Sequence, residues 1–266
     1  MKIGFIGAGN MATAIIEGLL GAGTPASDIA VFDMDKEKLG YFAEKGIFAE
    51  ENSCTLTGKC DIIVLAVKPQ NYSEVITEIA SVADMNKTFV SIAAGITIDF
   101  VRTKLGLECP VVRVMPNTPL LVGKGATAMC FSQNVSENVR EVTTSMFASS
   151  GVVEEFEEDK MDAIISVNGS SPAYFYLFAK AMADYAQSVG IDKDCAMNLI
   201  CAAMEGSAEM LRTSGDDPDT LIKKVSSKGG TTIEALNKFY EHNLEGAVKE
   251  AMAACTKRAG ELAAEA

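Results

Sequence analysis

The stretch "KIGFIGAGNMATAIIEGLL", residues 2–20, decides the fold of this 266-residue chain. A short β-type run leads into "GAGNMA", residues 7–12, which has the pattern G-x-G-x-x-A, and a helical pattern follows at once. In this context Gly7 permits a tight turn, Gly9 lets a pyrophosphate approach the backbone, and Ala12 lets helix and strand pack closely. The helix N-terminus then faces the phosphates. The stretch therefore predicts a dinucleotide-binding turn with the cofactor-binding residues Gly7, Gly9, Asn10 and Met11.

Strand-like and helix-like runs alternate through the rest of the first half of the chain. The run "DIIVLAV", residues 61–67, is continuously apolar, as expected for a strand buried on both faces. Such alternation predicts a Rossmann-type doubly wound parallel sheet with right-handed crossovers, which we assign to a first domain, residues 1–160. The other expected strands are residues 29–33, 88–95 and 110–115, and the helices between them are residues 35–46, 73–83 and 98–106.

Asp33 ends the second expected strand, where dinucleotide-binding sheets often carry an acid that accepts a hydrogen bond from the adenosine ribose. A carboxylate there favours NADH, because it repels the 2′-phosphate of NADPH. Lys36 and Lys38 follow closely, so NADPH is not excluded. Asp33 is also suited to cap the helix that follows, a role for which Asp35 competes.

Three turns occupy the edge of the sheet at which ligands bind, beyond the carboxyl ends of the strands. They are "AVKPQN" at residues 66–71, "IAAGIT" at residues 92–97 and "MPNTP" at residues 115–119. All three are rich in Pro, Gly, Ala or Asn, so their backbone groups can meet a flat ring. The alternative is ordinary loop chemistry without a ligand.

The second half of the chain, residues 161–266, is expected to be all helical. Ser171 as N-cap and Pro172 as the first helical residue predict the start of one long helix, and residues 192–215 predict another, ended by Gly215. Both helices carry small residues around their circumference, which is typical of a close subunit interface. We therefore interpret this half as a dimerisation domain, with a monomeric bundle as the alternative.

The segment "VSSKGGTTIEAL", residues 225–236, places two glycines directly before a helical pattern. Thr231 and Glu234 match a capping box, which starts the helix at this point. Backbone N–H groups and the helix dipole then form a nest for a carboxylate or phosphate, and nearby hydroxyl groups can donate as well. The residues alone allow any small acid, or a glycine-rich cap without a ligand.

Composition limits the possible functions. The net charge of −13 and a pI near 4.6 exclude the basic footprint that nucleic acid requires. The seven scattered cysteines and the single histidine, His242, have no metal-ligand spacing, so we expect no metal site and a reducing, cytoplasmic environment. We expect neither a cleaved signal peptide at the N-terminus nor a membrane span.

Six segments carry a resemblance to the pyrroline-5-carboxylate reductase family, and they occur in the family's order over nearly the whole chain. The pair "MPNTP" and "GGTT" is far more specific than a dinucleotide-binding turn alone. The resemblance implies reduction of L-1-pyrroline-5-carboxylate to L-proline with NADPH or NADH, the last step of proline biosynthesis. It also implies an interlocked dimer whose sites use helices from two chains, and rings of such dimers. The six segments are "IGFIGAGNMATAI", "AVKPQ", "SIAAGIT", "RVMPNTP", "VNGSSPAY" and "SSKGGTTIEAL".

The resemblance also assigns roles to individual residues. Thr232 would hydrogen-bond the ring nitrogen of the substrate, as the catalytic residue. The substrate carboxylate would lie among Ser227, Gly229, Gly230, Thr231 and Thr232. The cofactor-binding residues beyond the glycine-rich turn would be Asp33, Asn52, Ala66, Val67, Lys68, Pro69, Ala94, Gly95, Pro116 and Asn117.

Two positions depart from the family's pattern. Lys228 stands where the family usually has a proline, which adds a charge and removes a fixed φ. Asp33 stands where many relatives have a small or polar residue, so the cofactor preference stays open. Two rival functions also stay open at this point: a hydroxyacid reductase using Lys180 as acid–base catalyst, and a protein that binds a nucleotide without catalysis.

Overall fold

The computed structural model of this chain describes residues 1–265. Contacts divide the chain into two compact units, one of which comprises Met1–Pro172 and the segment from Ala254 onward, and the other Ala173–Ala253. Ala266, the last residue of the expected helical domain, lies outside the described residues.

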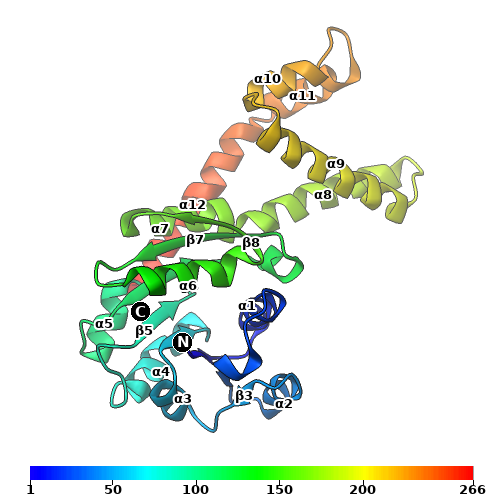
Figure 1. The fold of residues 1–266 in the computed structure, drawn as a ribbon. Helices are drawn as coiled ribbons and strands as arrows, with labels where there is room; N and C mark the ends of the chain where they lie inside the picture. The colour runs from blue at the N-terminus through cyan, green and yellow to red at the C-terminus, as the bar shows by residue number, and fades with distance from the viewer. Residues whose placement is uncertain (266) are drawn as a thin grey trace. The chain divides into compact units, whose positions relative to one another are not determined.

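The first unit is built on an eight-stranded sheet with the order β3-β2-β1-β4-β5-β6-β7-β8 (Figure 1). Neighbouring strands from β3 to β6 pair in parallel, as the alternating pattern predicts. The predicted doubly wound sheet is confirmed. The strands are β1 (Ile3–Ile6), β2 (Ile29–Phe32), β3 (Phe48–Ala49), β4 (Ile62–Leu65), β5 (Thr88–Ser91), β6 (Val111–Met115), β7 (Gly125–Phe131) and β8 (Gly151–Glu155).

Two strands at one end of the sheet were not expected from the sequence. β7 runs antiparallel to β6, and β8 is parallel to β7. The edge strand β8 is partly or fully exposed along its whole length, so it lacks the continuous apolar run of a central strand. These strands extend the sheet beyond its parallel part.

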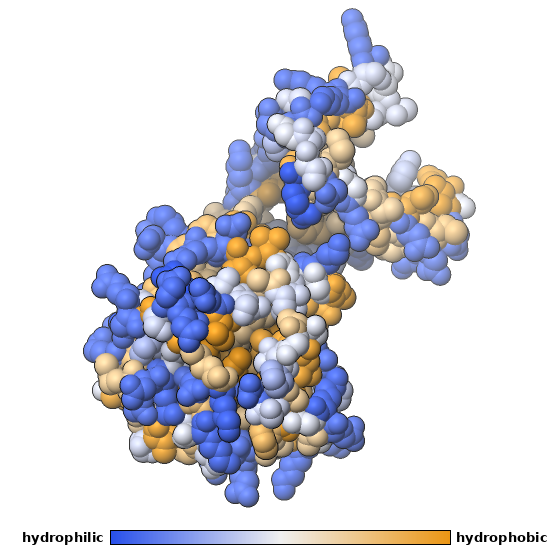
Figure 2. All heavy atoms as spheres, viewed as in Figure 1, coloured by the Kyte–Doolittle hydropathy of each residue, from blue (hydrophilic) through white to orange (hydrophobic). Residues whose placement is uncertain are grey.

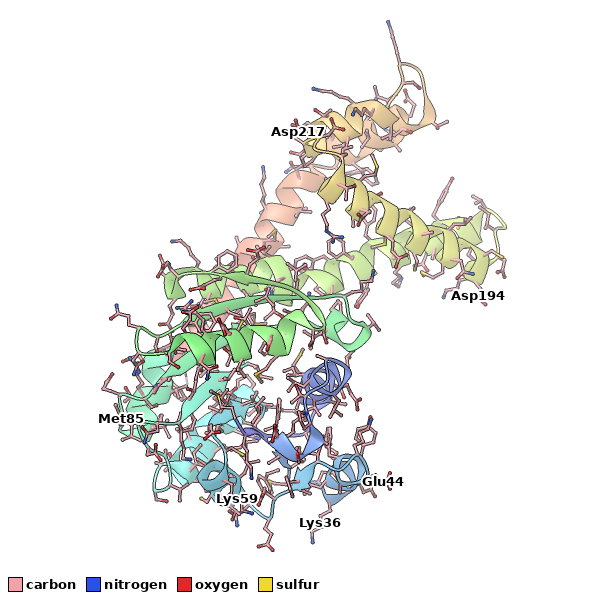
Figure 3. All side chains as sticks on the ribbon, viewed as in Figure 1. Lys36, Glu44, Lys59, Met85, Asp194 and Asp217 are labelled. Carbon is pink, nitrogen blue, oxygen red and sulfur yellow. The ribbon has the colours of Figure 1, made fainter. Side chains whose placement is uncertain are left out.

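Helices cover both faces of the sheet with two separate hydrophobic clusters. Ile15 and Ile16 of α1 and Phe147 of α6 pack on one face, while Leu56 of α3 and Val101 of α5 pack on the other. Lys36 and Glu44 mark the two ends of α2 (Figure 3). The helices are α1 (Asn10–Gly21), α2 (Lys36–Glu44), α3 (Ser53–Lys59), α4 (Tyr72–Ile79), α5 (Ile98–Leu105), α6 (Glu137–Ala148) and α7 (Met161–Ile164), with a π-helical turn at Ile165–Gly169.

The second unit is helical. Asp192 and Asp217 cap α9 and α10 by accepting hydrogen bonds from backbone N–H groups. Figure 3 labels Asp217 and also Asp194, which lies in the first turn of α9. Helix α8 begins at Ser171, which was predicted to be the N-cap, so the helix starts one residue before the predicted first residue, Pro172. The helices are α8 (Ser171–Ser188), α9 (Lys193–Thr213), α10 (Pro218–Val225), α11 (Thr231–Glu241) and α12 (Leu244–Glu265), of which the first two residues of α8 and the part of α12 from Ala254 onward belong to the first unit.

The second unit buries few hydrophobic side chains of its own. Its core cluster consists of Ala179, Ala183 and Ile200. Large apolar side chains such as Leu177 and Tyr185 are about 70% exposed, and hydrophobic residues are visible on the surface of these helices (Figure 2). Such an exposed apolar surface is typical of a site that associates with another protein surface. Among the described helices, none is both long enough and apolar enough to cross a membrane.

Candidate functional site

The glycine-rich turn joins β1 to α1 in a conformation that needs its glycines. Gly7 has a φ of 105°, and a Cβ there would lie 2.6 Å from the carbonyl oxygen of Ala66. Gly9 is the N-cap of α1, and a Cβ built on it would meet no atom within 4 Å. The backbone is therefore open above the turn. Asn10 and Met11 begin the helix, and their N–H groups have no acceptor within it.

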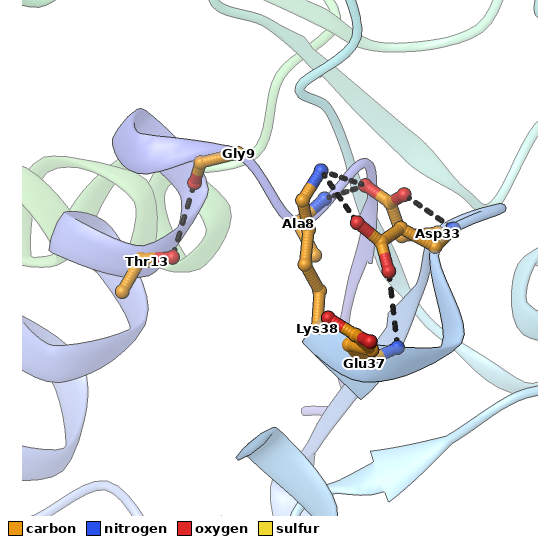
Figure 4. A network of polar contacts seen from close by, with 7 residues as sticks. Ala8, Gly9, Thr13, Asp33, Glu37 and Lys38 are labelled. Carbon is orange, nitrogen blue, oxygen red and sulfur yellow. Dashed lines mark hydrogen bonds and ion pairs between the residues drawn. The ribbon is translucent and has the colours of Figure 1, made fainter. Parts of the chain in front are cut away.

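Asp33 is tied to this turn by hydrogen bonds from the backbone (Figure 4). Its Oδ2 accepts from the Ala8 amide at 2.7 Å, and its Oδ1 accepts from the Asp35 amide at 2.9 Å. Lys38 Nζ lies 3.7 Å from the same Oδ2. Each carboxylate oxygen still has a lone-pair direction for a ribose hydroxyl. Asp33 thus holds the turn in place as well as facing the edge of the sheet.

The competing cap role belongs to Asp35, not to Asp33. Asp35 is the N-cap of α2, and its side chain accepts from the Glu37 amide at 3.0 Å. Asn52 caps α3 in the same way, by accepting from the Thr55 amide at 2.7 Å. Its amide nitrogen is a further donor that the cap does not use.

A cleft of about 310 Å³ opens at the carboxyl ends of β4, β5 and β6. All three predicted turns contribute to it, together with Met11 from the first turn of α1. Its walls are mainly apolar side chains and backbone, which suits a flat, uncharged ring. The predicted cofactor residues that line this cleft are Met11, Ala66, Val67, Pro69, Ala94, Pro116 and Asn117.

Two other predicted residues of these turns do not line the cleft. Lys68 is exposed at the start of a short 3₁₀ turn, Pro69–Asn71. Gly95 has a φ of 77° and packs against α12, since a Cβ there would lie 3.1 Å from Cβ of Leu262. A second hollow of about 190 Å³ adjoins Lys2, Asp28 and Cys60, which precede β1, β2 and β4, and it contains none of the predicted site residues.

Five residues that line the cleft were not named individually as site residues, although four of them lie in the predicted turns. Gly169 is the most informative, because it comes from the π-helical turn and not from a sheet turn. Asn168 beside it donates to the carbonyl groups of Met115 and Ala126, while Asn117 donates to the Asn168 carbonyl at 3.1 Å. The motif "VNGSSPAY" in this segment was one of the six that carry the family resemblance, but no cofactor-binding role was predicted for its residues. The five are Ile92, Ala93, Met115, Thr118 and Gly169.

The expected anion nest forms a tight turn at the start of α11. Gly229 has a φ of 75°, and the Gly230 amide donates to the Ser227 carbonyl at 2.9 Å. A Cβ on Gly230 would lie 2.5 Å from Ser227 Oγ, so only glycine lets that hydroxyl lie over the turn. The expected capping box is wrong, because Gly230 is the N-cap and Thr231 is already helical. No side chain caps this helix start, which leaves the first-turn N–H groups of Thr231 and Thr232 directed out of the helix.

The ionisable groups provide no alternative acid or nucleophile in the cleft. Burial raises the pKa of the Cys60, Cys109 and Cys130 thiols to about 11 each, so these thiols stay protonated. Lys180, the lysine that a hydroxyacid reductase would need, is 70% exposed on α8 of the second unit and pairs with Asp184 at 2.5 Å. Within residues 1–265, no three His, Cys, Asp or Glu side chains are grouped to hold a metal ion.

Two family models match this chain. Residues 158–262 match the model for pyrroline-5-carboxylate reductase dimerisation, and residues 2–95 match the model for NADP oxidoreductases, coenzyme F420-dependent. The first match covers the helices α8 to α12, and the second covers the glycine-rich turn and the sheet as far as the turn after β5.

Similar proteins cover the chain from end to end. The pyrroline-5-carboxylate reductases of Haemophilus influenzae and Escherichia coli are 38% and 37% identical to it, each over 98% of this chain and at least 97% of their own length. A solved structure of the reductase from Coxiella burnetii is 32% identical, with a TM-score of 0.90 over 98% of both chains. The structure of the Plasmodium falciparum pyrroline carboxylate reductase with NADP bound is 28% identical, with a TM-score of 0.91 over 99% of this chain and 98% of its own.

Proposed function

Because this chain belongs to the pyrroline-5-carboxylate reductase family, we propose that it reduces L-1-pyrroline-5-carboxylate to L-proline with NADPH or NADH. The observation that carries the proposal within the structure is the meeting of three turns and the α1 N-terminus at one cleft. This arrangement is suited to a dinucleotide with a flat reactive ring.

The residues of the first unit fit such a cofactor. The open backbone above Gly9 leaves space for a pyrophosphate, and the N-terminus of α1 stabilises its charge. Asp33 and Asn52 would lie near the adenosine ribose, while Lys68 and Gly95 support the turns that hold the other end. When bound, the reduced nicotinamide supplies the hydride that adds to C5 of the substrate imine.

The nest before α11 is our proposed site for the substrate carboxylate. Ser227 Oγ and the Thr231 amide would donate to it, and the helix dipole adds partial positive charge. Gly229 supplies the left-handed residue of the turn and Gly230 the space for the serine hydroxyl. Since the Gly230 amide already donates within the turn, it contributes to shape rather than to a carboxylate contact.

Thr232 is our proposed catalytic residue. Its hydroxyl would hydrogen-bond the ring nitrogen and fix the orientation of the imine. A cyclic imine accepts hydride well only when protonated, and an alcohol is too weak an acid to protonate it alone. Since the substrate enters largely in its protonated form, its iminium N–H donates to the Thr232 hydroxyl oxygen, which orients the ring. After hydride has added to C5, the neutral amine takes up a proton from water, and the Thr232 hydroxyl relays that proton.

The chain is a dimer through its helical region, which matches the family's dimerisation model. The exposed apolar side chains of α8 and α9 support this association. We extend the proposal to an interlocked dimer and to rings of dimers. The division into domains at residues 1–160 and 161–266 and the cytoplasmic location stay predictions; the odd number of scattered cysteines supports the latter.

The test is the loss of absorbance at 340 nm with pyrroline-5-carboxylate, run in parallel with NADH and NADPH. Turnover with either cofactor is the expected result, and the ratio of the two rates gives the preference. A β-hydroxyacid with the oxidised cofactors serves as the control for the rival chemistry. Folded protein that binds either cofactor tightly but turns over no imine would contradict the proposal and favour a non-catalytic nucleotide-binding protein.

A further inference from the structure

A buried arginine lies behind the cleft, on the strand that leads into it. The Arg113 side chain, in β6, is only 4% exposed and has two acidic partners. Its Nη2 lies 2.5 Å from Asp162 Oδ1, and its Nη1 lies 3.6 Å from Glu158 Oε1. A buried guanidinium needs such partners, because an unpaired charge in the interior is strongly unfavourable.

Glu158 has a second contact, and this one reaches the wall of the cleft. Its Oε1 accepts a hydrogen bond from the Ile98 amide at 2.7 Å. Ile98 is the first residue of α5 and follows the turn of residues 92–97 directly. Its N–H group has no acceptor within the helix, so the carboxylate satisfies it and complements the helix dipole.

The segments joined by this network are those that build the cleft. The turn of residues 92–97 supplies Ile92, Ala93 and Ala94, and β6 continues from Arg113 into the lining residues 115–118. Asp162 belongs to α7, which leads into the π-helical turn that ends at Gly169. A single carboxylate–guanidinium network therefore connects three of the five segments that line the cleft.

We infer that Glu158 is a positioning residue for the nicotinamide cofactor. Held by Arg113, its carboxylate fixes the end of the 92–97 turn through the Ile98 amide, and thereby the wall that the cofactor contacts. The inference rests on the proposed function, since it assumes that the cleft holds a nicotinamide cofactor. Glu158 itself lines no part of the cleft, so it acts through the turn.

The turn depends on this support because its own backbone is permissive. Gly95 has a φ of 77° at its centre, and the end of α12 packs against that glycine. One side of the turn is therefore held by a packing contact, and its end by two hydrogen bonds: from Ile98 to Glu158 and from the Phe100 amide to the Thr97 hydroxyl that caps α5. Loss of the hydrogen bond to Glu158 leaves the glycine-containing turn free to take other conformations.

Three substitutions separate the hydrogen bond from the ion pair. Glu158→Gln keeps an acceptor oxygen but loses the charge, Glu158→Asp keeps the charge but is one methylene shorter, and Glu158→Ala loses both. Glu155→Gln is the matched control, because Glu155 pairs with Arg140 at 2.6 Å in the same unit and lines no part of the cleft. The dissociation constant for NADH is measured by calorimetry and by nicotinamide fluorescence, which is free of tryptophan background in this chain.

We expect Glu158→Ala and Glu158→Asp to raise the dissociation constant and the KM for NADH about tenfold, the size of one lost hydrogen bond. The kcat at saturating NADH and the KM for the imine stay within about threefold of wild type. Glu158→Gln and the Glu155→Gln control bind NADH as wild type does. This split between Gln and Asp is not expected for a residue that only stabilises the fold.

Equal losses in Glu158→Gln and Glu158→Ala, tracking their melting temperatures, would reduce the network to a structural ion pair and overturn the inference. Unchanged NADH binding in Glu158→Ala would do the same, with the proposed function left intact. If instead wild type binds neither NADH nor NADPH, the proposed function fails and the inference with it.

Discussion

Replacing Asp33 by Asn separates the observed contact of this carboxylate with the glycine-rich turn from its proposed contact with the cofactor ribose. Asp33 accepts a hydrogen bond from the Ala8 amide within the glycine-rich turn (Figure 4), and it directly follows β2, at the sheet edge where we propose that the ribose lies. Asn keeps one acceptor oxygen, but its amide nitrogen cannot accept from the second backbone N–H. We therefore expect Asp33→Asn to weaken binding of both NADH and NADPH, and NADH more strongly.

The magnitude follows from the contacts. Two backbone N–H groups donate to the carboxylate, at 2.7 Å and 2.9 Å, and its side chain is 17% exposed. One charge-assisted hydrogen bond contributes about 1.5–3 kcal/mol, so its loss weakens cofactor binding by roughly tenfold to a hundredfold if the turn must form for binding. Removing the negative charge relieves repulsion of a 2′-phosphate by about 1 kcal/mol in an environment close to water. Lys38 already offsets part of that repulsion.

The assay is calorimetric titration of wild type and Asp33→Asn with NADH and with NADPH. The effect of a loosened turn is common to both cofactors and cancels in the ratio of their dissociation constants. That ratio should shift toward NADPH by about fivefold, the equivalent of about 1 kcal/mol. Asp35→Asn is the control, since it removes the same charge near Lys38 but caps α2 and does not contact the glycine-rich turn.

Two results would refute this reasoning. If Asp33→Asn binds both cofactors as wild type does, neither the charge of Asp33 nor its second backbone hydrogen bond is needed to hold the turn in its binding conformation. If both cofactors weaken but the ratio is unchanged, Asp33 supports the turn without facing the ribose.

Three further predictions concern the nest, the imine and the buried thiols. Gly230→Ala places a methyl group 2.5 Å from the present position of Ser227 Oγ and so displaces that hydroxyl. The KM for pyrroline-5-carboxylate should rise about tenfold, while the NADH affinity measured by calorimetry should not change. Thr232→Ala should lower kcat/KM by about 1–3 kcal/mol of transition-state stabilisation and alter the pH–rate profile, whereas an unchanged rate would remove Thr232 from the mechanism. The melting temperature should fall as the pH rises from 9 to 11, because thiols ionise near pH 9 in the unfolded chain, whereas burial raises the pKa of Cys60, Cys109 and Cys130 to about 11 in the folded chain. Thermal scans across that pH range test this, and the fall should be shallower in Cys60→Ala.

Most of the parallel part of the sheet was predictable because its longer strands are marked locally, whereas the two-residue, exposed strand β3 was not predicted. Continuous apolar runs bounded by turn residues specify β1, β4, β5 and β6 without knowledge of their neighbours. The direction of β7 could not be predicted, because its pairing with β6 depends on contacts between segments and not on the local sequence. Its sequence, "GATAMCF", contains glycine, alanine and methionine, which do not favour a strand over a helix or a loop.

The candidate site shows the same division between local and long-range information. Turn residues such as Pro69 and Pro116 were predictable, because the carboxyl ends of parallel strands meet at one edge. Gly169 was not, because it reaches the cleft through hydrogen bonds of Asn117 and Asn168 that join distant segments. The capping box failed because the pattern Thr-x-x-Glu is present, while Gly230 occupies the cap position that the pattern assigns to Thr231.

The two units differ in how they can hold a site rigid. In the first, Phe5, Ile15 and Val64 belong to a continuous core, so the glycine-rich turn is supported by buried packing within one chain. In the second, the proposed nest is borne by helices whose core cluster is Ala179, Ala183 and Ile200, with Ala196 also buried and Met197 and Met204 packed against the cluster. That much burial cannot offset the conformational entropy of ordering five helices. We therefore expect the apolar side chains exposed on α8 and α9 to be covered by a partner subunit before the proposed nest holds a substrate carboxylate in one orientation.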